Sequence, residues 1–303
     1  MLKLASSHKR GSDFRKKRFA ADLKCPRCGN SRIHRHGKYK GWRRYKCLSC
    51  KKTFNDATAS PIAGTHYSLQ KWLKYAACMS QGMSVRRTAQ KVGISVPTSF
   101  YWRHKILTAL RNLPKPSLTG IVEADETFFL ESQKESRHLR RPARSSGGTA
   151  TLPGISHHQV CVLVARDRQA STISEVVGRG RVTATQIAAA LNGVLRDCVL
   201  CSDAAAGYRK YANTYKIPLQ VLNATRGAKK YGLYHLNNVN AYHSRLKRWI
   251  RPFNGVSTKH LPNYLVWFQR QDAMSAMAHS VVANRLLDHS HLPTVFTTTK
   301  NLL

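Results

Sequence analysis

Apolar residues recur at helical intervals between residues 66 and 113. Ser68 can cap a first helix and Gly82 can end it, with apolar positions between them at Leu69, Trp72, Leu73, Tyr75, Ala76 and Met79. A second short helix is predicted over residues 84–92 and a third over 96–113, with a tight turn at 93–95. The pattern therefore predicts three consecutive helices.

The turn between the second and third helices is typical of a helix-turn-helix. Ala89 is followed four residues later by Gly93, and small residues there allow two helices to cross closely. The third helix would lie in the DNA major groove and offer these side chains to the base edges: Thr98, Ser99, Tyr101 and Arg103. A plain three-helix bundle used for packing or dimerisation is the alternative.

Beyond Pro114 and Pro116 the pattern changes to strands. Strands are predicted over residues 121–130, 159–167, 171–177, 199–202 and 217–222, and helices over 183–196 and 208–215. Three meandering strands followed by alternating helix and strand give the element order of an RNase H-like domain. Residues 131–158, rich in Arg, Lys, Ser, Gly and Pro, predict a long basic loop.

A last amphipathic helix is predicted over residues 238–253. Its apolar stripe consists of Tyr242, Leu246, Trp249, Ile250 and Phe253, and its polar stripe of Asn240, Ser244, Lys247 and Arg251. Docking by the apolar stripe would present Asn240 and Lys247 together, and a tilt would bring the polar stripe against a neighbouring site. A solvated polar stripe is the alternative.

The charge of the chain indicates the kind of partner that it binds. The 303 residues carry 51 Lys and Arg against 14 Asp and Glu, a formal net charge of +37. Such self-repulsion is tolerable when the chain meets a polyanion, and nucleic acid is the densest common one. Residues 1–24 hold eight of these cations in a stretch with little apolar periodicity, which reads as a basic arm or as a solvated tail.

The cysteines predict a structural metal. Cys25 and Cys28 form one Cys-x-x-Cys pair, and Cys47 and Cys50 form another eighteen residues further on. This spacing is typical of a closed four-cysteine zinc ribbon. The intervening segment mixes aromatic residues with cations, among them Arg43 and Arg44, and we expect it to contact DNA. Cys198 and Cys201 have no partner pair nearby and are interpreted as buried thiols.

Three of the scarce acids fall in the first strand of the predicted α/β domain: Glu123, Asp125 and Glu126. Carboxylates on a core strand cost free energy unless a cation compensates them. Glu123 and Asp125 share one face and Glu126 points to the other. Asp203 ends the fourth strand, which in an RNase H-like fold is adjacent to the first, so Asp125 and Asp203 are expected to share metal.

With these motifs the chain resembles the transposases of insertion sequence family fifteen-ninety-five. The resemblance is carried by the paired cysteines, by residues 122–127, by Cys201-Ser-Asp203 and above all by residues 235–249 (HLNNVNAYHSRLKRW). It runs from about residue 20 to about residue 270. It implies a bacterial or archaeal enzyme with a zinc ribbon, a helix-turn-helix and an RNase H-like domain that cuts and joins DNA.

The resemblance also implies the catalytic residues. Asp125, Asp203 and Asn240 match the family's Asp-Asp-Asn branch, with Lys247 as the accompanying basic residue. No acid lies between Asp203 and Asp272, so a third ligand from the last helix must be neutral. Two Mg²⁺ ions, or Mn²⁺, would bind Asp125, Asp203 and Asn240, and Lys247 would hold a phosphate. Glu123 and Glu126 are either auxiliary ligands or partners of local arginines.

These inferences combine into a multidomain α+β chain. We expect a basic arm over residues 1–20, a zinc ribbon over 21–56, a helix-turn-helix over 66–113, an RNase H-like catalytic domain over 118–270 and a C-terminal tail over 271–303. The expected function is that of a cytoplasmic transposase that binds the inverted repeats at the ends of its element, as a homo-oligomer and without a membrane partner. A DNA-binding repressor with an inactive catalytic domain and a nuclease without strand transfer are the alternatives.

Overall fold

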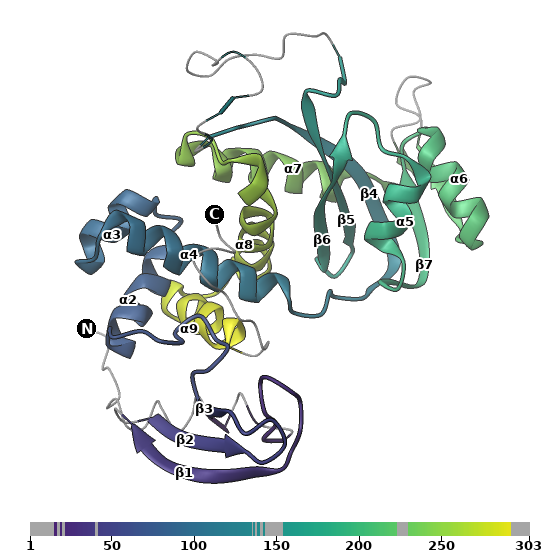
Figure 1. The fold of residues 1–303 in the computed structure, drawn as a ribbon. Coiled ribbons are helices and arrows are strands. Elements are labelled where there is room, and N and C mark those ends of the chain that lie inside the picture. The colour runs from purple at the N-terminus through teal and green to yellow at the C-terminus, as the bar shows by residue number, and fades with distance from the viewer. Residues whose placement is uncertain are drawn as a thin grey trace. The chain divides into compact units, whose positions relative to one another are not determined.

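The computed structural model of the chain (Figure 1) describes residues 15–16, 19, 22–39, 42–134, 136, 138–139, 142, 154–222 and 230–291. The fold divides into two compact units. One comprises Met1–Leu113 together with Met274–Leu303, and the other comprises Pro114–Ala273. The basic arm predicted over 1–20 lies almost wholly outside the described residues, as do residues 143–153 of the predicted basic loop.

A small antiparallel sheet forms the first part of the first unit. Its strands are β1 (Ile33–Tyr39), β2 (Trp42–Cys47) and β3 (Thr53–Asn55), and β2 lies in the middle. The first Cys-x-x-Cys turn lies before β1, and the second begins at Cys47, the last residue of β2. Tyr45 stacks on Phe54 with ring centroids 5.2 Å apart, and these two rings pack with Cys25 and Cys47 into a local core.

Three helices follow, as the sequence predicts. They are α2 (Leu69–Ser80), α3 (Val85–Val92) and α4 (Val96–Arg111). Each begins at a serine whose hydroxyl accepts a backbone N–H three residues on: Ser68, Ser84 and Ser95. Gly93 ends α3 with φ +71°, the left-handed conformation that favours glycine at a helix end.

A fourth helix from the far end of the chain belongs to the same unit. Residues His279–Ser290 form α9, which packs against α2 and α4. Its buried positions include Val282, Ala283, Leu286 and Leu287. Part of the stretch predicted as a tail over 271–303 is therefore a helix that completes the core of the N-terminal unit.

The second unit is built on a five-stranded mixed sheet in the order β6-β5-β4-β7-β8. Its central strand β4 pairs parallel with β7 and antiparallel with β5, while β7 and β8 are parallel. The strands span these residues: β4 Leu118–Leu130, β5 Gln159–Asp167, β6 Thr172–Arg179, β7 Leu195–Ser202 and β8 Leu219–Val221.

Helices cover both faces of this sheet. On one face α5 (Ala184–Leu191) and α6 (Ala206–Tyr215) pack on alternate residues of β4 and β5 such as Val122 and Leu163. On the other face α7 (Asn237–Ile250) and α8 (Leu261–Ala273) pack on the intervening residues of β5, including Val162. A short hairpin of β9 (Lys230–Tyr231) and β10 (Tyr234–His235) precedes α7. The central strand β4 is thus buried between helices on both faces of the sheet.

Two helices end at least three residues earlier than the sequence predicts. The helix predicted over 183–196 ends at Leu191, because a turn containing Gly193 (φ +77°) leads directly into β7 at Leu195. The helix predicted over 238–253 ends at Ile250, and residues Arg251–Phe253 form a 3-10 turn. Pro252 lies in this turn and has no backbone N–H to continue the α-helix. Across the described ranges, no helix is both long enough and apolar enough to cross a bilayer.

Candidate catalytic and metal-binding sites

Asp125 and Asp203 come together at the centre of the mixed sheet. Asp125 lies on β4, and Asp203 follows the last residue of the neighbouring parallel strand β7. In the parallel pairing of β4 with β7, Glu123 lies opposite Cys201. Asp125 and Asp203 each lie two residues further along, so they are opposite one another. Each is fixed by a backbone N–H donor, Glu126 N at 2.9 Å from Asp125 Oδ1 and Ala205 N at 3.0 Å from Asp203 Oδ1.

The electrostatics show that these carboxylates repel one another. Burial, together with the nearby negative charge of Asp203, raises the pKa of Asp125 to about 6, against the lowering effects of the Glu126 N–H and of Lys247. Burial and the charges of Asp125 and Asp203 raise the pKa of Glu126 to about 7. Within the described residues, no Lys or Arg nitrogen lies within 4.0 Å of these three carboxylates. Such an uncompensated group of oxygen ligands suits a hard divalent cation.

Most other acids of this unit already have partners. Asp272, which is only 7% exposed, pairs with Arg166 and Arg245 at 2.8 Å. Glu131 pairs with Arg179 at 2.5 Å, and Glu175 pairs with Lys115 at 2.7 Å. The Asp167 carboxylate accepts the N–H groups of its own turn, at Gln169 and Ser171. Apart from Asp167 and the exposed Asp197, the described acids of this unit that lack a cation lie where β4 and β7 meet.

Glu123 is one of the paired acids. The sequence left it as either an auxiliary metal ligand or a partner of a local arginine, and in the structure it pairs with Arg168. Its fully buried carboxylate accepts the backbone N–H groups of Asn238 and Val239 at 2.8 and 3.0 Å and the Asn238 side-chain amide at 2.8 Å. It also lies 2.5 Å from Arg168 and 3.2 Å from His235. With these partners the carboxylate docks the first turn of α7 on β4, and it leaves no oxygen free for a metal.

Glu126 has a different environment on the opposite face of β4. The hydroxyl of Tyr208, a fully buried residue of α6, donates a hydrogen bond of 2.5 Å to Glu126 Oε1. This bond partly opposes the rise in the Glu126 pKa. Glu126 is thus held close to the two aspartates, and its protonation changes near neutral pH.

Helix α7 presents its polar side to Asp125. His243 Nδ1 lies 3.8 Å from Asp125 Oδ2, and the charge of Lys247 lowers the pKa of Asp125. Asn240 lies one turn before His243 on the same helix face and is exposed. The opposite side of α7 packs into the core through Tyr242 and Leu246, as the sequence predicts.

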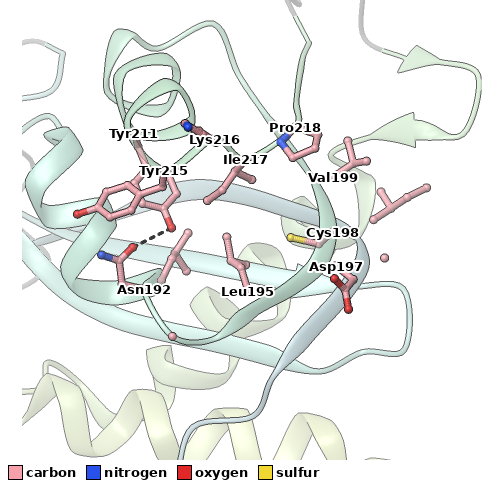
Figure 2. A pocket seen from close by; sticks show the side chains of 14 residues that line it. Asn192, Leu195, Asp197, Cys198, Val199, Tyr211, Tyr215, Lys216, Ile217 and Pro218 are labelled. Atoms are coloured by element: carbon pink, nitrogen blue, oxygen red, sulfur yellow. Dashed lines mark hydrogen bonds between the residues drawn. The ribbon is translucent and has the colours of Figure 1, made fainter.

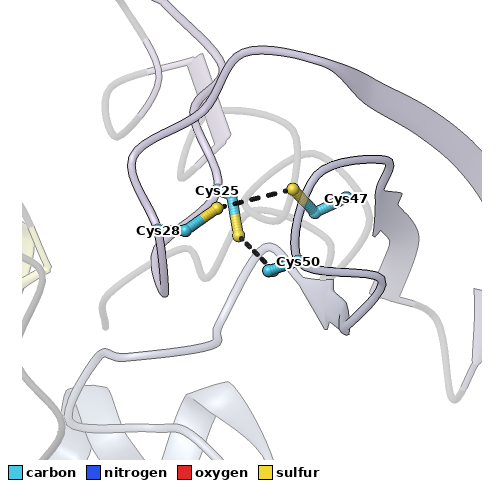
Figure 3. Close-up of side chains that lie close together, drawn as sticks. All are labelled: Cys25, Cys28, Cys47 and Cys50. Carbon is cyan, nitrogen blue, oxygen red and sulfur yellow. Dashed lines mark hydrogen bonds between the residues drawn. The ribbon is translucent and has the colours of Figure 1, made fainter.

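The four ribbon cysteines gather at one point (Figure 3). Their sulfur atoms all lie within 4.8 Å of one another, with Cys25 and Cys50 3.7 Å apart and Cys28 and Cys47 3.6 Å apart. Tetrahedral zinc with bonds of about 2.3 Å requires sulfur atoms about 3.8 Å apart. Backbone N–H groups of Cys50 and Ser49 help to lower the pKa of Cys47 to about 6, which favours the thiolate that zinc binds. The cluster has the ligand set and the geometry of a structural zinc site.

The structure corrects part of the predicted DNA-reading set on α4. Ser99 and Arg103 are fully buried, and they donate hydrogen bonds to the carbonyl oxygens of Val85 and Met83 at 2.9 and 2.6 Å. Their positions, four residues apart, face α3 rather than solvent. Thr98 and Tyr101 keep partly exposed side chains. In the ribbon, Arg43 and Arg44 on β2 are also partly exposed.

A separate hollow of about 780 Å³ lies near the start of β7 (Figure 2). Its lining includes Tyr211, Tyr215 and Lys216, and Tyr211 donates a hydrogen bond to Asn192 at 3.2 Å. Cys198 lines this hollow and is partly buried, whereas Cys201 is fully buried in the sheet. Neither Asp125 nor Asp203 lines the hollow, so it is distinct from the acidic site.

Comparison with known proteins gives the family of the second unit, which carries these acids. Residues 117–270 match the model of the ISXO2-like transposase domain, which is half of the chain. The chain belongs to this transposase family. The match covers Asp125, Asp203 and Asn240, and its ends nearly coincide with those of the second unit, Pro114–Ala273.

A relative of this transposase occurs in an archaeon. The chain is 27% identical over 248 residues to an uncharacterized protein in transposable element ISH50 of Halobacterium salinarum, which covers 81% of this chain and 83% of the relative. Among solved structures, a pre-cleavage Mos1 transpososome matches at 12% identity with a TM-score of 0.26, over 72% of this chain and 78% of that chain. A Drosophila P element transposase strand transfer complex matches at 11% identity with a TM-score of 0.31, over 69% and 58%.

Two residues that contact the acidic group, His243 and Tyr208, are absent from the predicted site residues. His243 follows Asn240 by three residues and precedes Lys247 by four, the spacing that places all three on one helix face. That spacing could have identified it. Tyr208 carries no comparable signal, because its contact with Glu126 joins residues 82 positions apart.

Proposed function

We propose that this transposase binds the terminal inverted repeats of its insertion sequence and cuts and joins DNA strands with two divalent cations, Mg²⁺ or Mn²⁺. The observation that carries the proposal is the group of mutually repelling carboxylates at Asp125 and Asp203, facing α7 with Asn240 and Lys247. When bound, two such cations activate a water or a DNA 3′-hydroxyl and stabilise the leaving oxygen.

The residues of the chain divide the work. Asp125 and Asp203 hold the cations, because they combine negative charge with fixed backbone hydrogen bonds. Asn240 contributes a neutral carbonyl oxygen from the exposed face of α7. Lys247, whose charge acts on Asp125, holds a DNA phosphate beside the site. Glu126 changes the net charge of the site near neutral pH, since its pKa is about 7.

The sheet order supports an RNase H-like assignment for this unit. Two antiparallel strands, β5 and β6, flank the central β4 on one side, and the parallel strands β7 and β8 flank it on the other. This is the arrangement expected of three meandering strands followed by alternating helices and strands. It brings the acidic positions of β4 and β7 together, as shared metal binding requires.

The N-terminal unit supplies DNA binding in this proposal. Helices α3 and α4, joined by the left-handed turn at Gly93, serve as a helix-turn-helix that presents Thr98 and Tyr101. The cysteine cluster holds zinc and keeps the ribbon, with Arg43 and Arg44, in position. The net charge of +37 supplies attraction to the DNA phosphates. Since an element has two ends, we expect copies of the chain to act together on them.

The test uses the full chain with zinc, duplex DNA carrying the element end, and Mg²⁺ or Mn²⁺. Strand nicking and strand joining are scored separately on sequencing gels. We expect both activities in the wild type and neither in Asp125→Asn or Asp203→Asn. Asp197→Asn is the matched control. Asp197 is an exposed residue of β7, the strand that leads to Asp203, and this variant should keep both activities.

The outcomes distinguish the alternatives. Binding without cleavage by the wild type would favour a repressor with an inactive catalytic domain. Cleavage without joining would favour a nuclease. Retained cleavage in Asp125→Asn would show that the Asp125 carboxylate is not needed for cleavage, contrary to the proposal.

A further inference from the structure

His243 is a buried imidazole that none of the assignments above uses. The residue is 8% exposed and lies on α7 between Asn240 and Lys247, facing Asp125. Its Nε2 atom is buried and makes no hydrogen bond to any described residue. The Nδ1 atom, which faces Asp125, likewise makes no hydrogen bond to a described residue, so the role of this nitrogen calls for an explanation.

Neither a hydrogen bond nor an ion pair with Asp125 explains it. The Nδ1 to Oδ2 distance of 3.8 Å is too long for a hydrogen bond. Burial and the positive charge of Lys247 both lower the pKa of His243, which disfavours an ion pair with Asp125. A neutral imidazole carries one proton and offers the lone pair of its other nitrogen.

The same distance suits two ligands of one cation. Metal to nitrogen and metal to oxygen bonds are each about 2.1 Å, so two atoms on one cation can lie up to about 4.2 Å apart. The 3.8 Å between His243 Nδ1 and Asp125 Oδ2 falls within this limit. Asp125 pairs with no Lys or Arg among the described residues, so its carboxylate oxygens are available to a cation.

From this geometry we infer that His243 is a third protein ligand of the cation held by Asp125, and that it makes the site prefer a first-row transition cation such as Mn²⁺ over Mg²⁺. The inference rests on the proposed function, because it needs a metal at Asp125. Imidazole suits transition cations, whereas Mg²⁺ prefers oxygen ligands. The ligand set would then consist of carboxylates, one imidazole and the neutral Asn240.

The direct test is pulsed electron paramagnetic resonance of Mn²⁺ bound to the full-length, zinc-loaded chain. A nitrogen that coordinates Mn²⁺ produces a characteristic ¹⁴N modulation, whatever the catalytic activity. We expect this modulation in the wild type and its loss in His243→Gln, together with a weakening of Mn²⁺ binding by about tenfold or more. Mg²⁺ affinity, measured by competition, should fall less.

His260→Gln is the matched control. His260 is also 8% exposed, and burial with the charge of Lys259 likewise lowers its pKa to about 4, but it lies in the turn before α8. This variant should keep both the ¹⁴N modulation and the Mn²⁺ affinity. Circular dichroism melting of both variants checks that each is folded.

Asp125→Asn separates failure of this inference from failure of the proposed function. If Asp125→Asn abolishes Mn²⁺ binding while His243→Gln leaves both the modulation and the affinity unchanged, the His243 assignment is wrong and the acidic metal site stands. If Asp125→Asn leaves Mn²⁺ binding unchanged, the acidic metal site and the inference both fall. Bound Mn²⁺ in the wild type without ¹⁴N modulation also overturns the inference.

Discussion

The carboxylate of Glu123 caps helix α7 by accepting the backbone N–H of Asn238, although 115 positions separate the two residues. Helix α7 has no side-chain cap of its own at Leu236, and Glu123 instead accepts two of its free N–H groups. A negative charge at this end also interacts favourably with the helix dipole. Since β4 carries Asp125 and α7 carries Asn240 and Lys247, this contact sets the spacing of the proposed catalytic residues.

Glu123→Gln should therefore reduce both stability and activity. The amide keeps one acceptor for the α7 N–H groups but loses the charge that pairs with Arg168. Hydrogen bonds to buried charged groups contribute about 1.5–3 kcal/mol, and we expect a loss of unfolding free energy in that range. Urea unfolding measures it, and DNA cleavage should fall because α7 is no longer fixed.

Glu175→Gln is the control for this substitution. Its ion pair with Lys115 has a similar length, 2.7 Å, but the two side chains are 36% and 40% exposed. Pairs of this kind contribute about 0–1 kcal/mol. An equal loss of stability in both variants would contradict the capping role of Glu123.

Metal binding should strengthen as the pH rises through 6. Asp125, with a pKa raised to about 6, must lose its proton before it binds a cation. For the metal-free fold the sign is opposite: a carboxyl group with a raised folded pKa binds its proton more tightly in the folded state. Its contribution to stability is therefore present at low pH and declines between about pH 4 and 6. Mn²⁺ titrations and thermal melts from pH 4 to 8 measure both trends, and parallel trends would contradict the assignment.

Tyr208→Phe should shift the pH dependence of cleavage upward. The Tyr208 hydroxyl stabilises ionised Glu126, so its removal raises the Glu126 pKa further. We expect the ascending limb of the pH–rate profile to move to higher pH. Tyr211→Phe, which removes a hydroxyl from the same helix that is bonded to Asn192 instead, should leave the profile in place. Identical profiles for all three proteins would exclude Glu126 from the titration.

Cys28→Ser should remove zinc from the ribbon. The wild type is expected to hold one zinc per chain, and loss of one of four thiolate ligands opens the closed site. Zinc content by mass spectrometry and DNA affinity should both fall, while the second unit keeps its fold. Cys78→Ser, at a buried cysteine of α2 outside the cluster, is the control. Unchanged zinc stoichiometry in Cys28→Ser would remove the ribbon assignment.

Arg103 and Thr98 should respond differently to substitution. Arg103 is fully buried and its guanidinium donates a hydrogen bond to Met83 O, so Arg103→Ala leaves this carbonyl without its donor and should cost about 1–3 kcal/mol of stability. Thr98→Val should lower DNA affinity with little change in melting temperature, because its side chain is partly exposed at the start of α4. Loss of DNA affinity in Arg103→Ala without destabilisation would return Arg103 to the base-reading set.

Local sequence determined most of the elements of this chain. Serine caps, Gly93 and the apolar spacing of α2, α3 and α4 act over a few residues, so they can be recognised without the fold. The same holds for the four cysteines, whose spacing predicts their convergence. The apolar stripe of α7 likewise predicted the side that packs on the sheet.

The tertiary structure decided which side chains share an environment. Helix α9 packs against α2, which begins 210 residues earlier, and no local pattern indicates that partner. Sequence could not divide the three acids of β4 among their roles, because Arg168, Tyr208 and His243 reach Glu123, Glu126 and Asp125 from other elements. Burial and nearby charge raise the pKa values of Asp125 and Glu126, and both are properties of the folded chain.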